Sequence, residues 1–136
     1  MEPIDPLPQL SQYKEEMLRE RIFQLVEEEK LYLKPNLKIN DLAKLLNSNR
    51  NYIYQAINVG IGLSFSDYIN QKRIEHAKQA LMENPHVLLT EVATNSGFSS
   101  ISTFYRNFRM FEGYSPSDFQ QQCLKGSTPT ANRTRN

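Results

Sequence analysis

Two stretches of the 136-residue chain are rich in side chains that carry hydrogen-bond donors and acceptors. The first contains Arg50, Asn51, Tyr54 and Gln55. The second contains Ser102, Thr103, Tyr105, Arg106 and Arg109. Asn and Gln pair bidentately with adenine, Arg pairs with guanine, and Tyr can contact a thymine methyl group or a phosphate. Both stretches suit a nucleic acid, although such residues are more often only the solvated face of a helix.

Each polar stretch lies on the second helix of a predicted helix-turn-helix unit. In the first unit, apolar residues at i, i+3, i+4 and i+7 indicate a short helix. They are Ile39, Leu42, Ala43 and Leu46. Asn40 is the predicted N-cap of this helix, Asn47-Ser48-Asn49 is the predicted turn, and a new apolar face begins at Ile53. A second helix in this register can enter the major groove of DNA.

The same pattern recurs about 50 residues later. Leu89 corresponds to Ile39 with an offset of 50, whereas Phe104 corresponds to Ile53 with an offset of 51. The second turn, Gly97-Phe98-Ser99-Ser100, is therefore one residue longer than the first. A helix predicted over 64–84, capped by Ser64, joins the two units and would span about 30 Å. Duplicated two-helix units of this kind are more typical of small DNA-binding folds than of solenoids.

The flanking segments complete an all-α organisation. Pro3, Pro6 and Pro8 predict an extended start, followed by an amphipathic helix over about 11–30. That helix either packs on the following domain or connects to upstream sequence. We expect an N-terminal extension over 1–38, a double helix-turn-helix domain over 39–123 and a disordered tail over 124–136. Within the domain, the predicted parts are a first unit over 39–62, a linker helix over 64–84 and a second unit over 88–123, which ends in a short helix after Ser115-Pro116.

Composition excludes several other classes. No apolar run approaches the roughly 20 residues of a membrane span, and the first residues lack a signal-peptide pattern, so we expect a cytoplasmic protein without membrane contact. Cys123, the single cysteine, is interpreted as an ordinary free thiol, and neither a metal site nor a cofactor is predicted. No nucleophile–base pair or phosphate-binding loop indicates an enzyme. Residues 1–38 carry a net charge of −2 and residues 39–136 a net charge of +3, which is a weak signal for nucleic acid.

From Ile39 to Gln122, the chain resembles the C-terminal DNA-binding domain of the AraC/XylS transcriptional regulators. The most specific stretch, from Glu91 to Arg109, reads EVATNSGFSSISTFYRNFR. It is followed by Gly113-Tyr114-Ser115-Pro116 and by Phe119, as in the family. The segment over 65–81, FSDYINQKRIEHAKQAL, is similar to the family's linker helix.

The resemblance implies a homeodomain-like fold of about seven helices that binds promoter DNA and usually activates transcription through RNA polymerase. Carried over by position, the base-reading residues are Asn51, Tyr54, Gln55, Ser102, Tyr105 and Arg106. The helix starts at Asn49 and Ser100 suit phosphate oxygens. The predicted phosphate contacts are accordingly Asn49, Arg50, Ser100, Thr103 and Arg109.

The chain departs from the family pattern at several positions. Asn47-Ser48 stands where Gly followed by an apolar residue is commoner, and Gln55 stands where a basic residue is frequent. Gln120 replaces a common Arg in the closing helix. These differences weaken the resemblance more in the first unit than in the second.

Two further expectations concern partners. Members of the family commonly carry an upstream sensing or dimerisation domain, which 38 residues cannot hold, so the sequence favours a portion of a larger sensor-regulator over a short stand-alone regulator. We expect the acidic face of the helix within 15–29 to lie away from bound DNA. The alternative from another class is a helical protein–protein interaction module that does not bind DNA.

Overall fold

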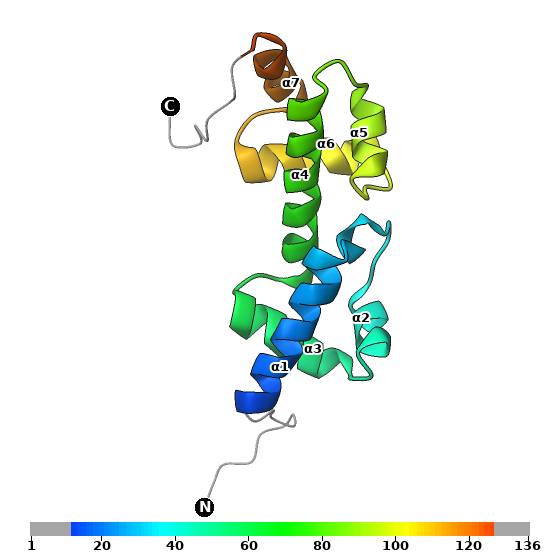
Figure 1. Ribbon diagram of the computed structural model, residues 1–136, viewed down its shortest axis with the longest axis vertical. Coiled ribbons are helices and arrows are strands. Elements are labelled where there is room, and N and C mark those ends of the chain that lie inside the picture. The colour runs from blue at the N-terminus through cyan, green and yellow to red at the C-terminus, as the bar shows by residue number, and fades with distance from the viewer. Residues whose placement is uncertain (1–11, 127–136) are drawn as a thin grey trace, which may run out of the picture. The chain divides into compact units, whose positions relative to one another are not determined.

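The computed structural model describes residues 12–126, which form helices joined by short turns (Figure 1). Within this range there are seven α-helices and no strand. They are α1 (Gln12–Phe23), α2 (Ile39–Leu45), α3 (Arg50–Gln55), α4 (Phe65–Glu83), α5 (Leu89–Asn95), α6 (Ile101–Glu112) and α7 (Pro116–Leu124). The prediction of an all-α, double helix-turn-helix fold is confirmed, with α1 as the first of the seven. The predicted Pro-rich start, the helix start at Ser11 and residues 127–136 of the predicted tail lie outside the described residues.

The chain divides into two compact units. The N-terminal unit comprises the residues up to Leu31 together with Leu37–Tyr68, and the C-terminal unit comprises Tyr32–Asn36 and the residues from Ile69 onward. Residues 32–36 therefore pack with the C-terminal unit, although the sequence placed them in the N-terminal extension. Helix α7 extends to Leu124, which the sequence assigned to the tail.

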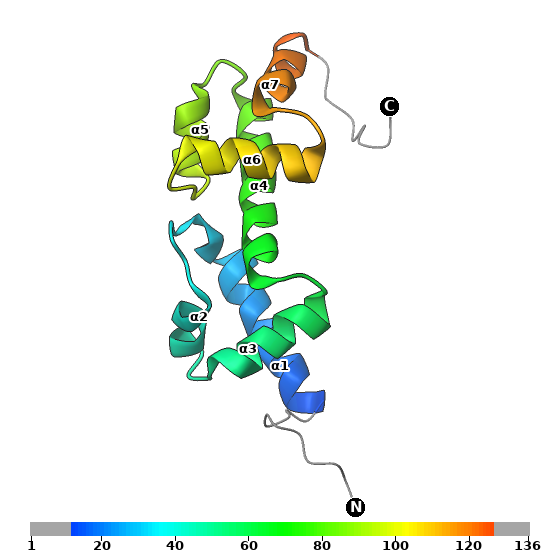
Figure 2. The same ribbon diagram turned by 180° about the vertical axis from the view of Figure 1, so that it is seen from behind.

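The N-terminal unit has a small aliphatic core. Its fully buried aliphatic residues are Ile22, Val26, Leu42, Ile53, Ala56 and Ile57. Two helices of this unit continue beyond their α-helical part as π-helical segments, α1 over Gln24–Glu28 and α3 over Ala56–Ile61. Helix α1 packs against the second of these segments (Figures 1 and 2). Helix α3 packs against α2 and buries Ile53, so its polar residues stay outside the core.

The C-terminal unit is built around an aromatic cluster. Phe98, Phe104, Phe108 and Phe119 are at most 3% exposed, and the ring of Phe108 lies 5.6 Å from that of Phe119. Aliphatic residues of α4 and α5 complete the core. They are Ile74, Ala77, Leu81, Val92 and Ala93. Helix α6 crosses α4 in both views (Figures 1 and 2). Its Phe104 and Phe108 are fully buried in this cluster. The opposite side of α6 is therefore fixed in its orientation by the core.

Local capping chemistry sets most of the helix starts. Asn49, Ser64, Ser100 and Ser115 each accept a hydrogen bond from the backbone N–H three residues later, and Pro116 occupies the first turn of α7. The predicted cap at Asn40 is wrong. Lys38 is the extended residue before α2, and its N–H donates to Asp41 Oδ2 at 2.9 Å, because the Asp41 side chain folds back over the helix start.

Candidate nucleic-acid interface

Helix α3 presents most of its predicted DNA-contacting residues to solvent. Arg50, Asn51 and Tyr54 are exposed, and Gln55 is half-buried. On the other side of the helix, Ile53 is fully buried. The structure thus brings the four side chains onto the outer surface of the N-terminal unit, where their polar groups can face a ligand.

The turn before α3 holds a residue in a left-handed conformation. Asn47 has φ +52°, a region that Asn enters more readily than other non-glycine residues. Its counterpart in the second turn is Gly97, with φ +99°. Asn47 therefore supplies in the first turn the positive-φ conformation that Gly97 supplies in the second. The side-chain Oδ1 of Asn49 accepts a hydrogen bond from the Tyr52 N–H at 3.0 Å, so this oxygen caps the N-terminus of α3.

Helix α6 exposes a polar stripe on the side opposite Phe104 and Phe108. Ser102, Arg106 and Arg109 are exposed at i, i+4 and i+7, which places them on one face of the helix. All three were predicted from the sequence, and the structure brings them together. An Arg pair beside a hydroxyl group can bind base edges and phosphates in the major groove.

The remaining predicted residues of this unit are tied into the structure. Ser100 caps α6 and donates its hydroxyl proton to Thr103 Oγ1 at 3.0 Å. Tyr105 is half-buried, with its hydroxyl 3.1 Å from Ser117 Oγ of α7 and its ring edge-on to Phe104. Tyr105 is therefore less exposed than Arg106, and its hydroxyl group links α6 to α7.

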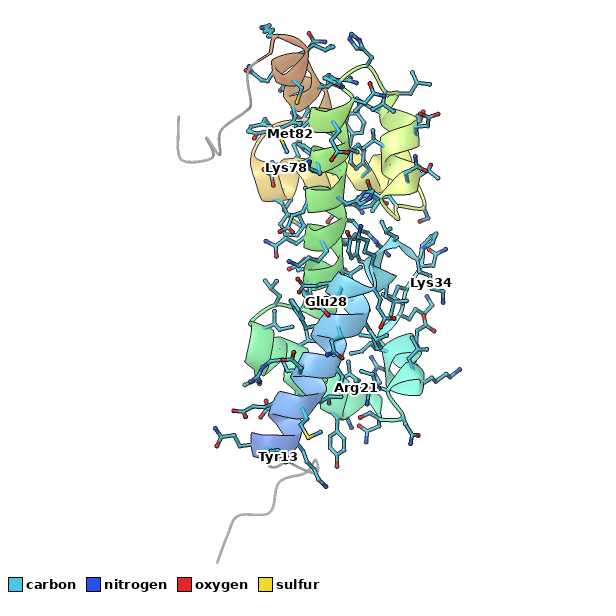
Figure 3. The ribbon with its side chains drawn as sticks, in the orientation of Figure 1. Tyr13, Arg21, Glu28, Lys34, Lys78 and Met82 are labelled. Carbon is cyan, nitrogen blue, oxygen red and sulfur yellow. The ribbon has the colours of Figure 1, made fainter. Side chains whose placement is uncertain are left out.

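Several residues that support α6 were not identified from the sequence. Lys78 of α4 pairs with Glu112 at 2.8 Å at the end of α6 (Lys78 in Figure 3), and the Glu112 side chain is 9% exposed. Asn107 is also buried and donates to the Thr103 carbonyl at 2.9 Å. Their positions could have indicated this role, because Asn107 and Glu112 are polar residues on the otherwise apolar side of an amphipathic helix. The Lys78–Glu112 pair joins the end of α6 to α4, whereas the Asn107 bond stays within α6.

Gln120 closes the C-terminal unit. Its amide donates to the carbonyls of Pro85 and Val87 at 3.0 and 2.7 Å. This amide joins α7 to the connection between α4 and α5.

A buried arginine joins the segment over 32–36 to α4. Arg73 donates through Nε to the Tyr32 carbonyl at 2.7 Å and through Nη2 to the Lys34 carbonyl at 2.8 Å. Its guanidinium lies 5.8 Å from the centre of the Phe98 ring. Burial lowers the pKa of Arg73 from its ordinary value, because removal from water disfavours the charged form. Three elements of the C-terminal unit therefore meet at this side chain.

Cys123 is half-buried, and burial raises the pKa of its thiol, which makes it less reactive. Between residues 12 and 126, no group of three or more His, Cys, Asp or Glu side chains is placed to hold a metal ion. In the same part of the chain, no helix is both long and apolar enough to span a bilayer.

Comparison with known sequences supports the structural assignment. The family model described as a helix-turn-helix domain matches residues 42–122. The Msm operon regulatory protein of Streptococcus mutans is 37% identical over 87 residues, which cover 64% of this chain and 31% of that protein. The transcriptional regulator YtdP of Bacillus subtilis, described as uncharacterised, is 29% identical over 63% of this chain and 11% of its own length. The chain therefore spans less than a third of these curated relatives.

Solved structures share the fold. The C-terminal domain of AraT, a response regulator from Geobacillus stearothermophilus, superposes with a TM-score of 0.66 at 21% identity over 90% of this chain and 92% of that domain. A probable AraC family transcriptional regulator from Rhodopseudomonas palustris gives a TM-score of 0.61 at 24% identity, with 84% and 96% covered. Because the family model covers more than half of the chain, the chain belongs to the AraC-type helix-turn-helix family of DNA-binding transcription regulators.

Proposed function

We propose that the chain recognises a promoter operator by inserting α3 and α6 into successive segments of the major groove. The observation that carries this proposal is the exposed stripe of Ser102, Arg106 and Arg109 on α6, a helix whose opposite face is anchored in an aromatic core. Side chains on a well-supported helix can discriminate bases, because their positions are set before binding.

The proposed roles follow from exposure and chemistry. Base reading is assigned to Asn51, Tyr54, Gln55, Ser102, Tyr105 and Arg106. Phosphate contact is assigned to Asn49, Arg50, Ser100, Thr103 and Arg109. Tyr105 would meet DNA through its ring, for example at a thymine methyl group, because its hydroxyl already contacts Ser117. Thr103 would offer its own hydroxyl proton, because its oxygen accepts from Ser100.

Selection of bound duplexes from a random library tests the proposal directly. The purified chain should be used at low and near-physiological salt. We expect an enriched motif with two half-elements about one helical turn apart, which corresponds to about 10 base pairs or 34 Å. A pool that remains random at both salt concentrations would contradict sequence reading by this chain.

The two arginines of α6 should behave differently on the selected site. Arg106→Ala should weaken cognate binding by about 1–3 kcal/mol and relax the preference at one base position, because a bidentate base contact is lost. Arg109→Ala should weaken binding to all DNA sequences similarly. It should also reduce the salt dependence of binding by the amount expected for about one phosphate contact. Titrations on the cognate site and on single-base variants measure both effects. Equal losses on every sequence for both variants would overturn the role of Arg106.

We also propose that this chain is the DNA-binding portion of a larger cytoplasmic sensor-regulator that contacts RNA polymerase. This is supported by its coverage of 31% of the Streptococcus mutans relative and by its likeness to a domain described as C-terminal in a response regulator. Transcription in vitro from a promoter that bears the selected operator tests the polymerase contact. An increase on adding the chain would support activation through the polymerase, and no change would count against it.

A further inference from the structure

A groove in the N-terminal unit lies between α1 and the turn that leads into α3. It has a volume of about 850 Å³. Lys14, Met17 and Arg21 line it from α1, and Asn47, Asn49 and Tyr52 line it from the turn and from α3. The α1 residues at 14, 17 and 21 follow helical spacing, so they form one side of that helix.

The groove is cationic, although α1 and the π-helical segment that continues it carry a net negative charge. Lys14 and Arg21 are the charged residues in its lining, and both are exposed. Glu15 and Glu16 instead line a separate hollow with Arg19, Val59 and Gly60. In Figure 3, Arg21 lies on the side of α1 that is turned toward α2 and α3. Helix α1 therefore lines this groove with Lys14 and Arg21, whereas its Glu15 and Glu16 line the other hollow, beside Val59 and Gly60.

The groove is continuous with the surface that α3 offers to DNA. Asn49 lines the groove and also caps α3, and Tyr52 lines it next to the exposed Asn51. Along α1, the seven-residue step from Lys14 to Arg21 covers about 10 Å. One DNA strand carries a phosphate about every 3.4 Å of duplex axis, so this distance corresponds to about three phosphates.

We propose that this groove binds the sugar-phosphate strand that flanks the bases read by α3, with Arg21 and Lys14 neutralising its phosphates. The inference rests on the proposed function, because it assigns a further part of the same DNA interface. Charge complementarity and continuity with α3 select DNA as the occupant. Glu15 and Glu16, which line the other hollow, would then lie outside this contact, and the expected orientation of the acidic face stays a prediction.

The salt dependence of operator binding tests this assignment. Lys14→Gln and Arg21→Gln remove charge while keeping long polar side chains, and the double variant should lose about two phosphate contacts. Each phosphate contact lowers the logarithm of the binding constant by about 0.9 for every tenfold rise in salt concentration. When salt rises from 50 to 200 mM, the affinity of the double variant should therefore fall by about tenfold less than the affinity of the unchanged chain. The selected base preferences should stay the same, because phosphates carry no sequence information.

Arg19→Gln is the matched control, since it removes one positive charge from the other side of the same helix. Its salt dependence should equal that of the unchanged chain, and circular dichroism of all variants should show the same helix content. An unchanged salt dependence in the double variant, or an equal decrease in the control, would overturn the inference while leaving the proposed function intact. Absence of an operator for the unchanged chain would instead contradict the proposed function, and the groove assignment with it.

Discussion

The Tyr68 hydroxyl illustrates how one buried polar group links two distant segments of the N-terminal unit. It donates to Glu27 Oε2 at 2.7 Å, and the Tyr68 side chain is 2% exposed. Burial, followed by the hydrogen bond and the charge of Glu27, raises the pKa of Tyr68, because each effect disfavours the phenolate. In the unfolded chain, the pKa of Tyr is about 10. The folded state therefore retains this proton at pH values where the unfolded state releases it.

This difference predicts a loss of stability at high pH. The contribution of Tyr68 is fully present below about pH 10 and decreases as the pH rises further, by up to about 1.4 kcal/mol per pH unit. Tyr68→Phe should lower the free energy of unfolding at pH 7 by about 1–3 kcal/mol and should flatten its decrease between pH 10 and 11. Urea unfolding at several pH values measures both effects. Tyr13→Phe is the control, because Tyr13 is 70% exposed. Parallel pH profiles for the Tyr68 variant and the unchanged chain would disprove the assignment.

At the scale of elements, the two turns adopt the same positive-φ backbone conformation with different residues. Gly97 has no side chain, and a Cβ there would lie 2.7 Å from the Tyr32 carbonyl oxygen and 2.9 Å from Arg73 Nε. These neighbours are a backbone atom and a buried, hydrogen-bonded guanidinium, so neither can move aside easily. Asn47 has a side chain that is exposed, so only its left-handed backbone conformation is special.

Substitutions in the two turns should therefore have unequal effects. Gly97→Ala should destabilise the C-terminal unit by about 2–4 kcal/mol, because the positive φ strain adds to a clash with the segment over 32–36. Asn47→Gly should change stability by less than about 1 kcal/mol, since glycine accepts the same conformation. Chemical denaturation with hydrogen exchange would assign each change to its unit. A Gly97→Ala variant as stable as Asn47→Gly would show that the close approach is relieved at little cost.

The helices and caps that could be predicted from the sequence depend on local chemistry. Helix periodicity and the caps at Ser100 and Ser115 involve neighbours within one turn, so they can be identified without the tertiary structure. The exposed stripe on α6 followed from the same periodicity. The error at Asn40 was also local, because Asn is a good cap in general but Asp41 competes successfully for this helix start.

The features that sequence reasoning missed depend on distant residues. Arg73 bonds to carbonyls 41 and 39 positions away, and Lys78 pairs with Glu112 at a separation of 34. Nothing in the neighbouring sequence distinguishes these charges from solvated ones. The groove beside α1 was missed for the same reason, since it forms only when α1 packs near the turn at Asn47.

At the scale of the whole molecule, near neutrality limits non-specific attraction to DNA. The chain carries 16 basic and 15 acidic residues, so its net charge of +1 gives little long-range steering. Under the proposed function, binding would therefore depend on a few exposed cations at fixed positions, such as Arg50 on α3 and Arg106 and Arg109 on α6. Two reading units in one chain increase affinity without additional charge, because binding of one unit raises the effective concentration of the other.

This coupling predicts that the two half-elements of the operator are read separately but bound together. Asn51→Ala with Gln55→Ala should relax base preference in one half-element only, and Ser102→Ala with Arg106→Ala should relax it in the other. Inserting about five base pairs between the half-elements should reduce affinity toward that of one unit, because half a helical turn moves the second site to the opposite face of the duplex. Library selection with each double variant and titrations on the altered spacing measure these effects. If either double variant relaxed the base preference equally in both half-elements, the two units would not read DNA independently. The duplicated units would then form a single recognition surface.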